Sequence, residues 1–252
     1  MSELGLSQET IDTAGTTLGV SGANEAKRVQ KEYMQNHRLN IPTLLMADII
    51  HGFRTIFPIP LALGSTWDEA AVEKMAEISA KEAAVSGLHV TFSPMVDLVR
   101  DPRWGRVMES TGEDPLLNSR LAAAMVRGYQ GENLKEDNWR VAACVKHFAA
   151  YGGALAGRDY NTVDMSERQL REMYLPGYKA GLDAGAKLVM TSFNTVDGIP
   201  ATGNQWLFRD VLRNEFGFEG VVISDWGAIK ELIPHGVAKD EKQAAELAIK
   251  AG

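Results

Sequence analysis

Short apolar runs alternate with longer amphipathic segments along most of the chain. This alternation is typical of βα units arranged around a parallel sheet. Each apolar run is nearly continuous, as expected for strands that are covered on both faces. The runs predict strands over residues 42–48, 88–97, 141–148, 187–194 and 220–226.

The segments between these runs carry helix start and stop signals. Asp68 precedes one amphipathic segment, Ser166 and Gln169 have capping-box spacing, and residues 205–217 close on Gly217. A further helix is predicted around residues 22–38, ahead of the first strand. Because no repeat or linker-like stretch interrupts this order, we interpret residues 1–252 as a single domain.

The predicted fold class is α/β, a parallel (β/α) barrel of the TIM type that is incomplete in this chain. The pattern supplies about five to six βα units, fewer than a closed barrel contains. The last helix signal, residues 241–252, reaches the end of the sequence with no strand after it. We therefore expect the chain to be part of a longer protein.

Composition narrows the possible partners and the compartment. The net charge of −7 and a pI near 5.3 provide no basic surface for nucleic acid or an anionic membrane. No segment approaches the roughly 20 apolar residues of a spanning helix, and the N-terminus lacks a secretory apolar region. The single cysteine, Cys144, lies in an apolar run and is expected in the core. We expect a cytoplasmic protein unless an export signal was removed from a longer precursor.

Polar residues follow all five predicted strands. They are Asp48, Asp97, Lys146 with His147, Ser192 with Asn194, and Asp225. The carboxyl ends of parallel barrel strands meet at one face, where the active sites of such barrels lie. A helix cap, a loop hydrogen bond or a core histidine would explain any one of these residues. Polar residues at all five strand ends together predict a shared cleft.

Several kinds of chemistry lack their sequence signals. There is no HExxH or CxxC motif, the glycines of residues 151–157 lack phosphate-loop spacing, and Ser224 lies in no GxSxG elbow. We therefore expect no metal and no cofactor, which leaves carboxylate chemistry with hydroxyl recognition. A carboxylate such as Asp225 can attack an anomeric carbon, while the indole of Trp226 covers a sugar face.

Five segments together carry a resemblance to a known family. They are MADIIHGFRTIFPIPLALGSTWD, SPMVDLVRDPRWGRVMESTGEDP, VKHFAAYG, TSFNTVDGIPAT and VVISDWGAI. In this order they resemble the N-terminal catalytic barrel of glycoside hydrolase family 3, which contains β-glucosidases and β-xylosidases. The resemblance implies a retaining, exo-acting β-glucosidase-like enzyme that forms a covalent glycosyl-aspartate on Asp225. Its substrate would be a β-glucoside or oligosaccharide.

The resemblance also implies roles for residues around the nucleophile. Asp48, Arg106, Lys146 and His147 match residues that hold the sugar before the scissile bond, and Trp226 matches an aromatic platform. Arg158 is a weaker match to a further binding arginine, and the family's Lys-His peptide bond is often cis.

The sequence departs from the family pattern in ways that bear on activity. Phe193 stands where many members have a tyrosine that contacts the nucleophile, and residues 149–167 lack the histidine of N-acetylglucosaminidases. The family's usual opening helix motif is absent ahead of residues 4–15. In other members a domain after the barrel carries the acid/base glutamate. We therefore expect this chain to be weak or inactive alone, with the C-terminal portion of the same enzyme as its partner and a homo-oligomer as a further possibility.

Three alternatives stay open at this point. The specificity could be that of a β-xylosidase, or the chain could be a non-catalytic carbohydrate-binding or structural fragment. Lys146 could also form a Schiff base in an aldolase, although that role would leave Asp48 and Asp225 unexplained. Three nearby carboxylates could substitute for the acid/base, but loop structure and helix capping are the expected roles of Glu109, Glu113 and Asp114.

Overall fold

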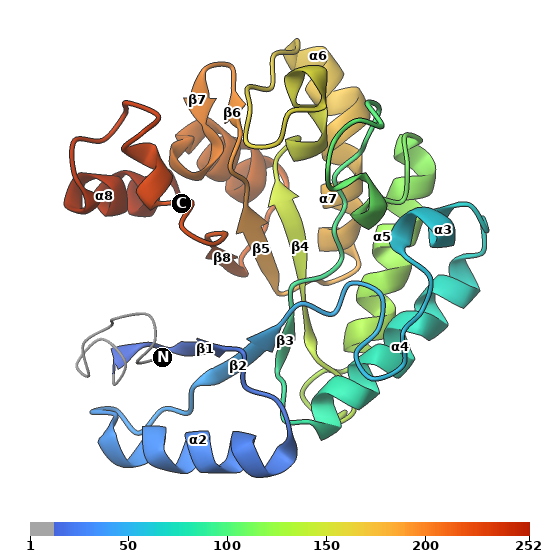
Figure 1. The fold of residues 1–252 in the computed structure, drawn as a ribbon, viewed down its shortest axis with the longest axis vertical. Helices are drawn as coiled ribbons and strands as arrows, with labels where there is room; N and C mark the ends of the chain where they lie inside the picture. The colour runs from blue at the N-terminus through green and yellow to red at the C-terminus, as the bar shows by residue number, and fades with distance from the viewer. Residues whose placement is uncertain (1–12) are drawn as a thin grey trace.

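Parallel strands form a curled sheet in the computed structural model, which describes residues 13–252 (Figure 1). Within this range the sheet has six strands in the order β1-β2-β3-β4-β5-β8. These strands are β1 (Thr16–Leu18), β2 (Leu44–Ala47), β3 (Val90–Thr91), β4 (Ala142–Phe148), β5 (Leu188–Thr191) and β8 (Val221–Ile223). The sheet leaves β1 and β8 as its edges, so the predicted incomplete (β/α) barrel is confirmed.

Helices cover the outer face of this sheet, and α4, α5 and α7 pack side by side along it (Figure 1). The helices are α2 (Ala23–Asn36), α3 (Pro60–Gly64), α4 (Glu69–Val85), α5 (Pro115–Gln130), α6 (Glu167–Gln169), α7 (Leu175–Asp183) and α8 (Glu241–Ala251). Two π-helical segments add Leu170–Tyr174 before α7 and Trp206–Glu215 before β8.

The predicted helix starts hold because each cap satisfies an otherwise free backbone N–H group. Asp68 accepts from the N–H of Ala71 at 3.0 Å, and Ser166 accepts from the N–H of Gln169 at 3.2 Å. The segment predicted over residues 205–217 is helical but wound as a π-helix, and it ends before Gly217, whose φ is +67°. The helix predicted around residues 22–38 corresponds to α2.

All five predicted strands are present, but each is shorter than its apolar run. The largest difference is at residues 88–97, where only Val90–Thr91 form regular strand. Pro94 has no N–H to donate to a neighbouring strand. Pairing with β4 nevertheless resumes beyond it, where the N–H of Val96 donates to the carbonyl oxygen of Lys146 at 2.8 Å.

Two strand features were not predicted. The edge strand β1 has only three residues and a single buried side chain. It is too short for an alternation of buried and exposed residues to be recognised in the sequence. The hairpin of β6 (Thr195–Val196) and β7 (Ile199–Pro200) turns at Asp197 and Gly198, which both have positive φ. An Asp-Gly pair is a known signal for such a turn, so this hairpin could have been identified.

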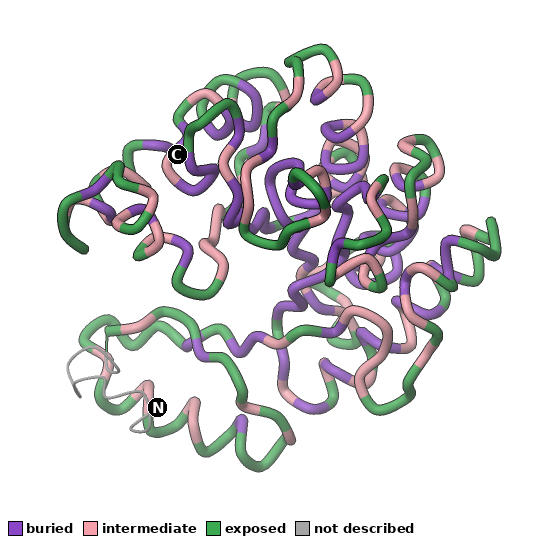
Figure 2. Tube along the Cα trace, turned by 45° about the horizontal axis from the view of Figure 1, so that its top comes forward, coloured by how far each residue is buried: buried purple, intermediate pink, exposed green. Residues whose placement is uncertain are grey.

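Buried residues concentrate between the central strands and the outer helices, whereas α2 is mostly exposed (Figure 2). Along β4 the side chains alternate between the two faces of the sheet. Ala143 and Val145 pack in the outer core, while Cys144 packs in the smaller cluster with Met46, Phe92 and Met190. Cys144 is a free, buried thiol, as the sequence predicted.

None of the helices within residues 13–252 is long and apolar enough to cross a membrane. Two expectations fall on residues outside the described range. They are the absence of a secretory region at the N-terminus and, for the most part, the absence of the family's opening motif.

Candidate active site

A cleft with a volume of about 480 Å³ opens at the carboxyl ends of the strands. Its polar side chains come from segments far apart in the sequence: Asp48 after β2, Arg106 in the loop after β3, Lys146 and His147 in β4, and Asp225 after β8. Met46, Phe92, Met190 and Ile223 supply its apolar floor. The structure therefore brings together residues from three of the five predicted strand ends and adds Arg106 from a loop. The polar residues of the other two strand ends, Asp97, Ser192 and Asn194, are buried and do not line the cleft.

Asp48 and Lys146 form an ion pair at one side of this cleft. The Nζ atom of Lys146 lies 2.7 Å from Oδ1 of Asp48. The lysine side chain is only 4% exposed, whereas the aspartate side chain is 56% exposed. A buried ammonium group requires a partner, and Asp48 supplies it while its remaining lone pairs face open space. A ligand hydroxyl at this position would meet both a cationic donor and an anionic acceptor.

Asp225 and His147 meet at the centre of the cleft. The Asp225 side chain is 16% exposed, and its Oδ2 atom lies 3.3 Å from Nε2 of His147. Its Oδ1 atom accepts a hydrogen bond from the N–H of Trp226 at 2.6 Å. The His147 side chain is almost fully buried, and its Nε2 atom has no hydrogen-bond partner. An unpartnered nitrogen beside a carboxylate leaves room for a donor from a bound molecule.

Lys146 and His147 are adjacent in β4, yet both line the cleft. Regular strand alternation would turn one of the two side chains away. The pairing of β4 with β5 shifts register between Val145 and Phe148, which interrupts the alternation at this point. The peptide bond between Lys146 and His147 is cis, as the resemblance allowed.

Arg106 reaches the cleft from a loop and is fixed by Glu109. Its Nε and Nη2 atoms donate to the two carboxylate oxygens of Glu109 at 2.7 and 2.9 Å. Burial lowers the pKa of Arg106, but the Glu109 carboxylate, with smaller contributions from Asp97 and Tyr151, outweighs this effect and the net pKa is raised. The guanidinium group therefore stays charged, and it also lies 5.7 Å from the ring centroid of Tyr151.

Three predicted residues lie elsewhere or at the rim. Phe193 does not line the cleft: its ring is buried against Tyr151 and Tyr160, with centroid distances of 5.7 and 4.5 Å. Arg158 is exposed in the loop after β4 and is not among the residues that line the cleft. Trp226 does line it, with 68% of its surface exposed.

Several residues that support the cleft were not identified as site residues from the sequence. Asp97 was noted as a strand-end carboxylate, but the structure buries it completely beneath His147. Glu109 lies three positions after Arg106, a spacing that could have indicated the ion pair. Tyr178 in α7 carried no sequence signal, because its partners are 31 and 81 positions away.

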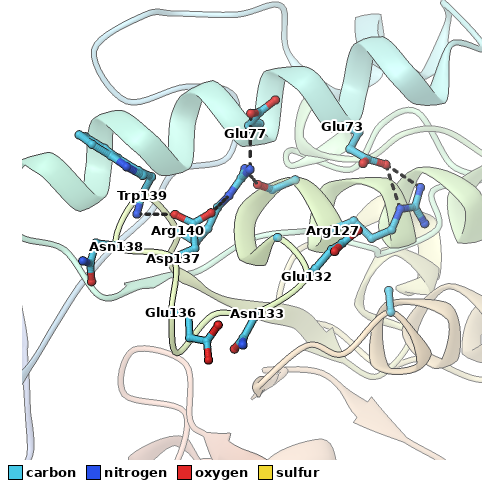
Figure 3. Close-up of a pocket in the computed structure, with 13 residues that line it drawn as sticks. Glu73, Glu77, Arg127, Glu132, Asn133, Glu136, Asp137, Asn138, Trp139 and Arg140 are labelled. Atoms are coloured by element: carbon cyan, nitrogen blue, oxygen red, sulfur yellow. Dashed lines mark hydrogen bonds and ion pairs between the residues drawn. The ribbon is translucent and has the colours of Figure 1, made fainter.

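A larger hollow, about 980 Å³, lies near the amino end of β4, away from these residues. Figure 3 shows three of its carboxylates, those of Glu73, Glu77 and Asp137, paired with its two arginines. Glu73 binds Arg127 at 2.8 Å, and Arg140 binds Asp137 at 3.0 Å and Glu77 at 3.4 Å. These pairs join α4, α5 and the loop before β4, so a structural role accounts for them. Within residues 13–252, no three histidine, cysteine, aspartate or glutamate side chains are grouped as metal ligands.

Known proteins are similar to the chain over most of its length. Residues 12–252 match the family model described as Glycosyl hydrolase family 3 N terminal domain. The chain is 49% identical over 228 residues to the periplasmic beta-glucosidase of Salmonella typhimurium, a match that covers 90% of the chain and 30% of that protein. It is 36% identical to a beta-xylosidase of Formosa agariphila, a match that covers 98% of the chain and 36% of that protein.

The same similarity extends to solved structures. The beta-glucosidase of Listeria innocua in complex with isofagomine superposes with a TM-score of 0.97 at 60% identity, covering 99% of this chain and 35% of that one. Its complex with glucose gives the same TM-score at 59% identity, with the same coverage of both chains. The chain thus spans about a third of the length of these relatives.

Proposed function

The chain belongs to glycoside hydrolase family 3, and from this premise we propose that it is the nucleophile-bearing part of a retaining, exo-acting β-glucosidase. The observation that carries the proposal is the placement of the Asp225 carboxylate in a cleft shared with Asp48, Arg106, Lys146 and His147. The similarity to β-glucosidases, one of them solved with glucose, supports a glucosyl substrate.

The first chemical step follows from the position of Asp225. Its Oδ2 atom lies 3.3 Å from Nε2 of His147, which makes no hydrogen bond, and attacks carbon 1 of the terminal sugar. The bond from carbon 1 to the leaving oxygen breaks as the new ester bond forms, and the leaving oxygen takes a proton from an acid. Water then attacks carbon 1 and gives its proton to the conjugate base of that acid, which releases Asp225 as a carboxylate and yields the sugar with its original configuration.

The remaining polar groups would hold the terminal sugar during both steps. The Asp48–Lys146 pair offers an acceptor and a cationic donor to adjacent hydroxyls. The Arg106 guanidinium group remains cationic on Glu109 and can donate to a further hydroxyl. The exposed indole of Trp226 can cover the C–H face of the ring at the rim. A cleft of about 480 Å³ is within the usual range for small ligands.

A retaining glycosidase also needs a second carboxyl group, roughly 5 to 5.5 Å from the nucleophile. Two of the nearby carboxylates have structural roles, since Glu109 holds Arg106 and Asp114 caps α5. The family resemblance puts the acid/base glutamate on a domain after the barrel, and we propose that this domain completes the site. On this proposal, the 252-residue chain hydrolyses ordinary glucosides weakly or not at all.

The test is covalent labelling of the 252-residue chain with 2,4-dinitrophenyl 2-deoxy-2-fluoro-β-glucoside, read by intact mass and peptide mapping. Dinitrophenolate leaves without being protonated, so the reagent needs the nucleophile but no acid. We expect one sugar adduct on the peptide that contains Asp225, and none in Asp225→Asn. An adduct on another carboxylate, or a folded chain that stays unlabelled, would contradict the proposal.

A β-xylosidase is the second candidate, because one relative of 36% identity carries that name. The two activities differ in whether the site accommodates the C6 hydroxymethyl group of glucose. Competing the glucoside reagent against the corresponding 2-deoxy-2-fluoro-β-xyloside separates them. Faster labelling by the xyloside would favour the second candidate while leaving the role of Asp225 intact.

A further inference from the structure

A buried hydrogen-bonded network lies directly beneath the cleft. Asp97, His147 and Tyr178 form it, and none of the three is more than 1% exposed. Asp97 follows β3, His147 lies in β4 and Tyr178 lies in α7. The network therefore joins two strands and one outer helix at the base of the candidate active site.

Asp97 contacts His147 at two atoms. Its Oδ2 atom lies 2.7 Å from Nδ1 of the imidazole and accepts the backbone N–H of the same residue at 3.1 Å. One carboxylate oxygen thus determines both the orientation of the imidazole ring and which of its nitrogens carries a hydrogen. A carboxylate oxygen that accepts from Nδ1 requires a hydrogen on Nδ1.

Tyr178 holds the other oxygen of the same carboxylate. Its hydroxyl group donates to Oδ1 of Asp97 and also lies 2.6 Å from the carbonyl oxygen of His147. The N–H of Ala150 donates to this hydroxyl oxygen at 3.2 Å. Burial and the nearby Asp97 raise the pKa of Tyr178, so the hydroxyl keeps its proton and remains a donor.

The charge state of His147 determines what its other nitrogen can do. Burial lowers the pKa of His147, an effect that Asp97 opposes and that Lys146 and Arg106 reinforce. A neutral imidazole has one N–H group, and Asp97 takes it at Nδ1. The Nε2 atom then carries a lone pair toward Asp225 Oδ2, which lies 3.3 Å away and is itself an acceptor.

We propose that Asp97, supported by Tyr178, is a positioning residue that holds His147 in the Nδ1–H tautomer and so presents Nε2 to the cleft as an acceptor for a sugar hydroxyl. The part that concerns the sugar rests on the proposed function. This tautomer has a second consequence, because an N–H group at Nε2 would donate to Asp225 and tie up the attacking oxygen. The network thus keeps the nucleophile free while it orders the ligand.

The primary measurement is ¹⁵N NMR of histidine-labelled protein at pH 7, with the His147 signals assigned by their loss in His147→Gln. We expect a protonated Nδ1 and an unprotonated Nε2 in the parent chain. A predominant Nε2–H tautomer in the folded parent chain would overturn the proposal. This readout needs neither a substrate nor a variant of Asp97.

The variants separate positioning from general support of the fold. In Asp97→Asn the amide oxygen can still accept both N–H groups of His147, and the amide NH₂ can donate to Tyr178. In Asp97→Ala the acceptor is lost, so the tautomer should shift to Nε2–H. Labelling of Asp225 should slow about 10-fold in Asp97→Ala, and Asp97→Asn should recover most of that loss.

Gln130→Leu is the matched control, because it removes a buried hydrogen bond to Ala143 and a partly buried one to Gly185 near the opposite end of β4. It should change neither the tautomer nor the labelling rate. If Asp97→Ala does not fold, Tyr178→Phe still tests the contact between Asp97 and His147. Without the hydroxyl donor of Tyr178, the negative charge of Asp97 is less stabilised by hydrogen bonding and attracts a proton on His147 more strongly, which should raise the pKa of His147. An unchanged His147 titration in folded Tyr178→Phe would contradict the supporting role of Tyr178.

The two proposals fail in different ways. A folded parent chain with the Nδ1–H tautomer but no label on Asp225 contradicts the proposed function, and the sugar-binding part of this inference falls with it. If the parent chain is labelled normally, but folded Asp97→Ala keeps the Nδ1–H tautomer or the labelling rate of the parent chain, only the positioning role of Asp97 is overturned.

Discussion

At the residue scale, the candidate site depends on pairing between buried and exposed charges. The Lys146 ammonium group is almost fully buried, and its ion-pair partner, Asp48, is exposed to the cleft. Such a lysine contributes a fixed donor because the ion pair holds its ammonium group in place before a ligand hydroxyl binds to it and to Asp48. Glu109 also holds Arg106 in place, but in that pair both side chains are partly buried, at 23% and 20% exposure.

Replacing Lys146 with methionine tests the contribution of this donor. The substitution keeps the length and apolar stem of the side chain but removes the charge, so the fold should survive. We expect the half-saturating concentration of the fluoroglucoside reagent to rise about 10- to 100-fold, as for a lost hydrogen bond to a charged group. Lys179→Met is the control, because Lys179 pairs with Asp183 on the exposed surface of α7. Equal effects of the two substitutions would contradict the binding role.

At the element scale, local caps and cross-strand contacts hold the units in place. Asp114 caps α5 by accepting the N–H of Leu117 at 2.7 Å, which places the start of that helix beside the loop that carries Arg106. His89 joins β2 to β3: its Nδ1 accepts the N–H of Leu45 at 3.0 Å, and its own N–H donates to the Leu45 carbonyl oxygen at 2.9 Å.

Replacing Asp114 with alanine should lower the free energy of unfolding by about 1 kcal/mol, the usual effect of removing an N-cap. The measurement is urea denaturation followed by circular dichroism. Glu113→Ala is the control, because Glu113 is exposed and lies just before the cap. Loss of Asp225 labelling in folded Asp114→Ala would show that the carboxylate has a chemical role and not only a structural one.

The contact between His89 and Leu45 also predicts a dependence of stability on pH. Although His89 as a whole residue is exposed, partial burial of its ring lowers its pKa from the ordinary value of 6.5, and a proton on Nδ1 would remove the acceptor of the Leu45 N–H. Below pH 6.5 the unfolded chain therefore binds more protons than the folded chain. Stability should thus fall as pH decreases below this value and level off above it.

Urea denaturation between pH 5 and pH 7.5 measures this slope. His89→Asn, whose amide oxygen can still accept a hydrogen bond, should flatten it. His147 has a pKa shifted in the same direction and should account for part of the slope that remains. The same substitution at His235, which lies outside the contact between β2 and β3, is the control. An identical slope in His89→Asn would contradict the assignment to His89.

At the scale of the whole molecule, the curled sheet has two free edges in the described residues. Leu18 in β1 is 47% exposed, and Val221 in β8 is 60% exposed. An apolar groove of about 490 Å³ lies between β8 and α8, where Ile249 is also exposed. Free strand edges with apolar side chains favour pairing with other chains.

We therefore expect the 252-residue chain to self-associate as its concentration rises. Sedimentation velocity over a concentration series measures this association. Leu18→Lys with Val221→Lys should weaken it, because a charged edge strand pairs poorly. Leu116→Lys, on the exposed surface of α5, should not. A parent chain that stays monomeric throughout the series would contradict the role of the edges.

The sequence by itself determined the order of strands and helices, most helix starts and the residue types at the strand ends. These features could be predicted because hydrophobic periodicity and capping act within a few residues of the chain. The same reasoning indicated where the cleft would form, since parallel strands must bring their carboxyl ends to one face. The motifs also identified the family.

Only the tertiary structure decided which side chains face one another. The register shift within β4 turns both Lys146 and His147 to the cleft, and curling of the sheet brings Lys146 to Asp48, 98 positions away. It also buries Asp97 beneath the site and withdraws Phe193 into an aromatic cluster. A strand-end position specifies an edge of the sheet, whereas the direction of a side chain depends on contacts with residues distant in sequence.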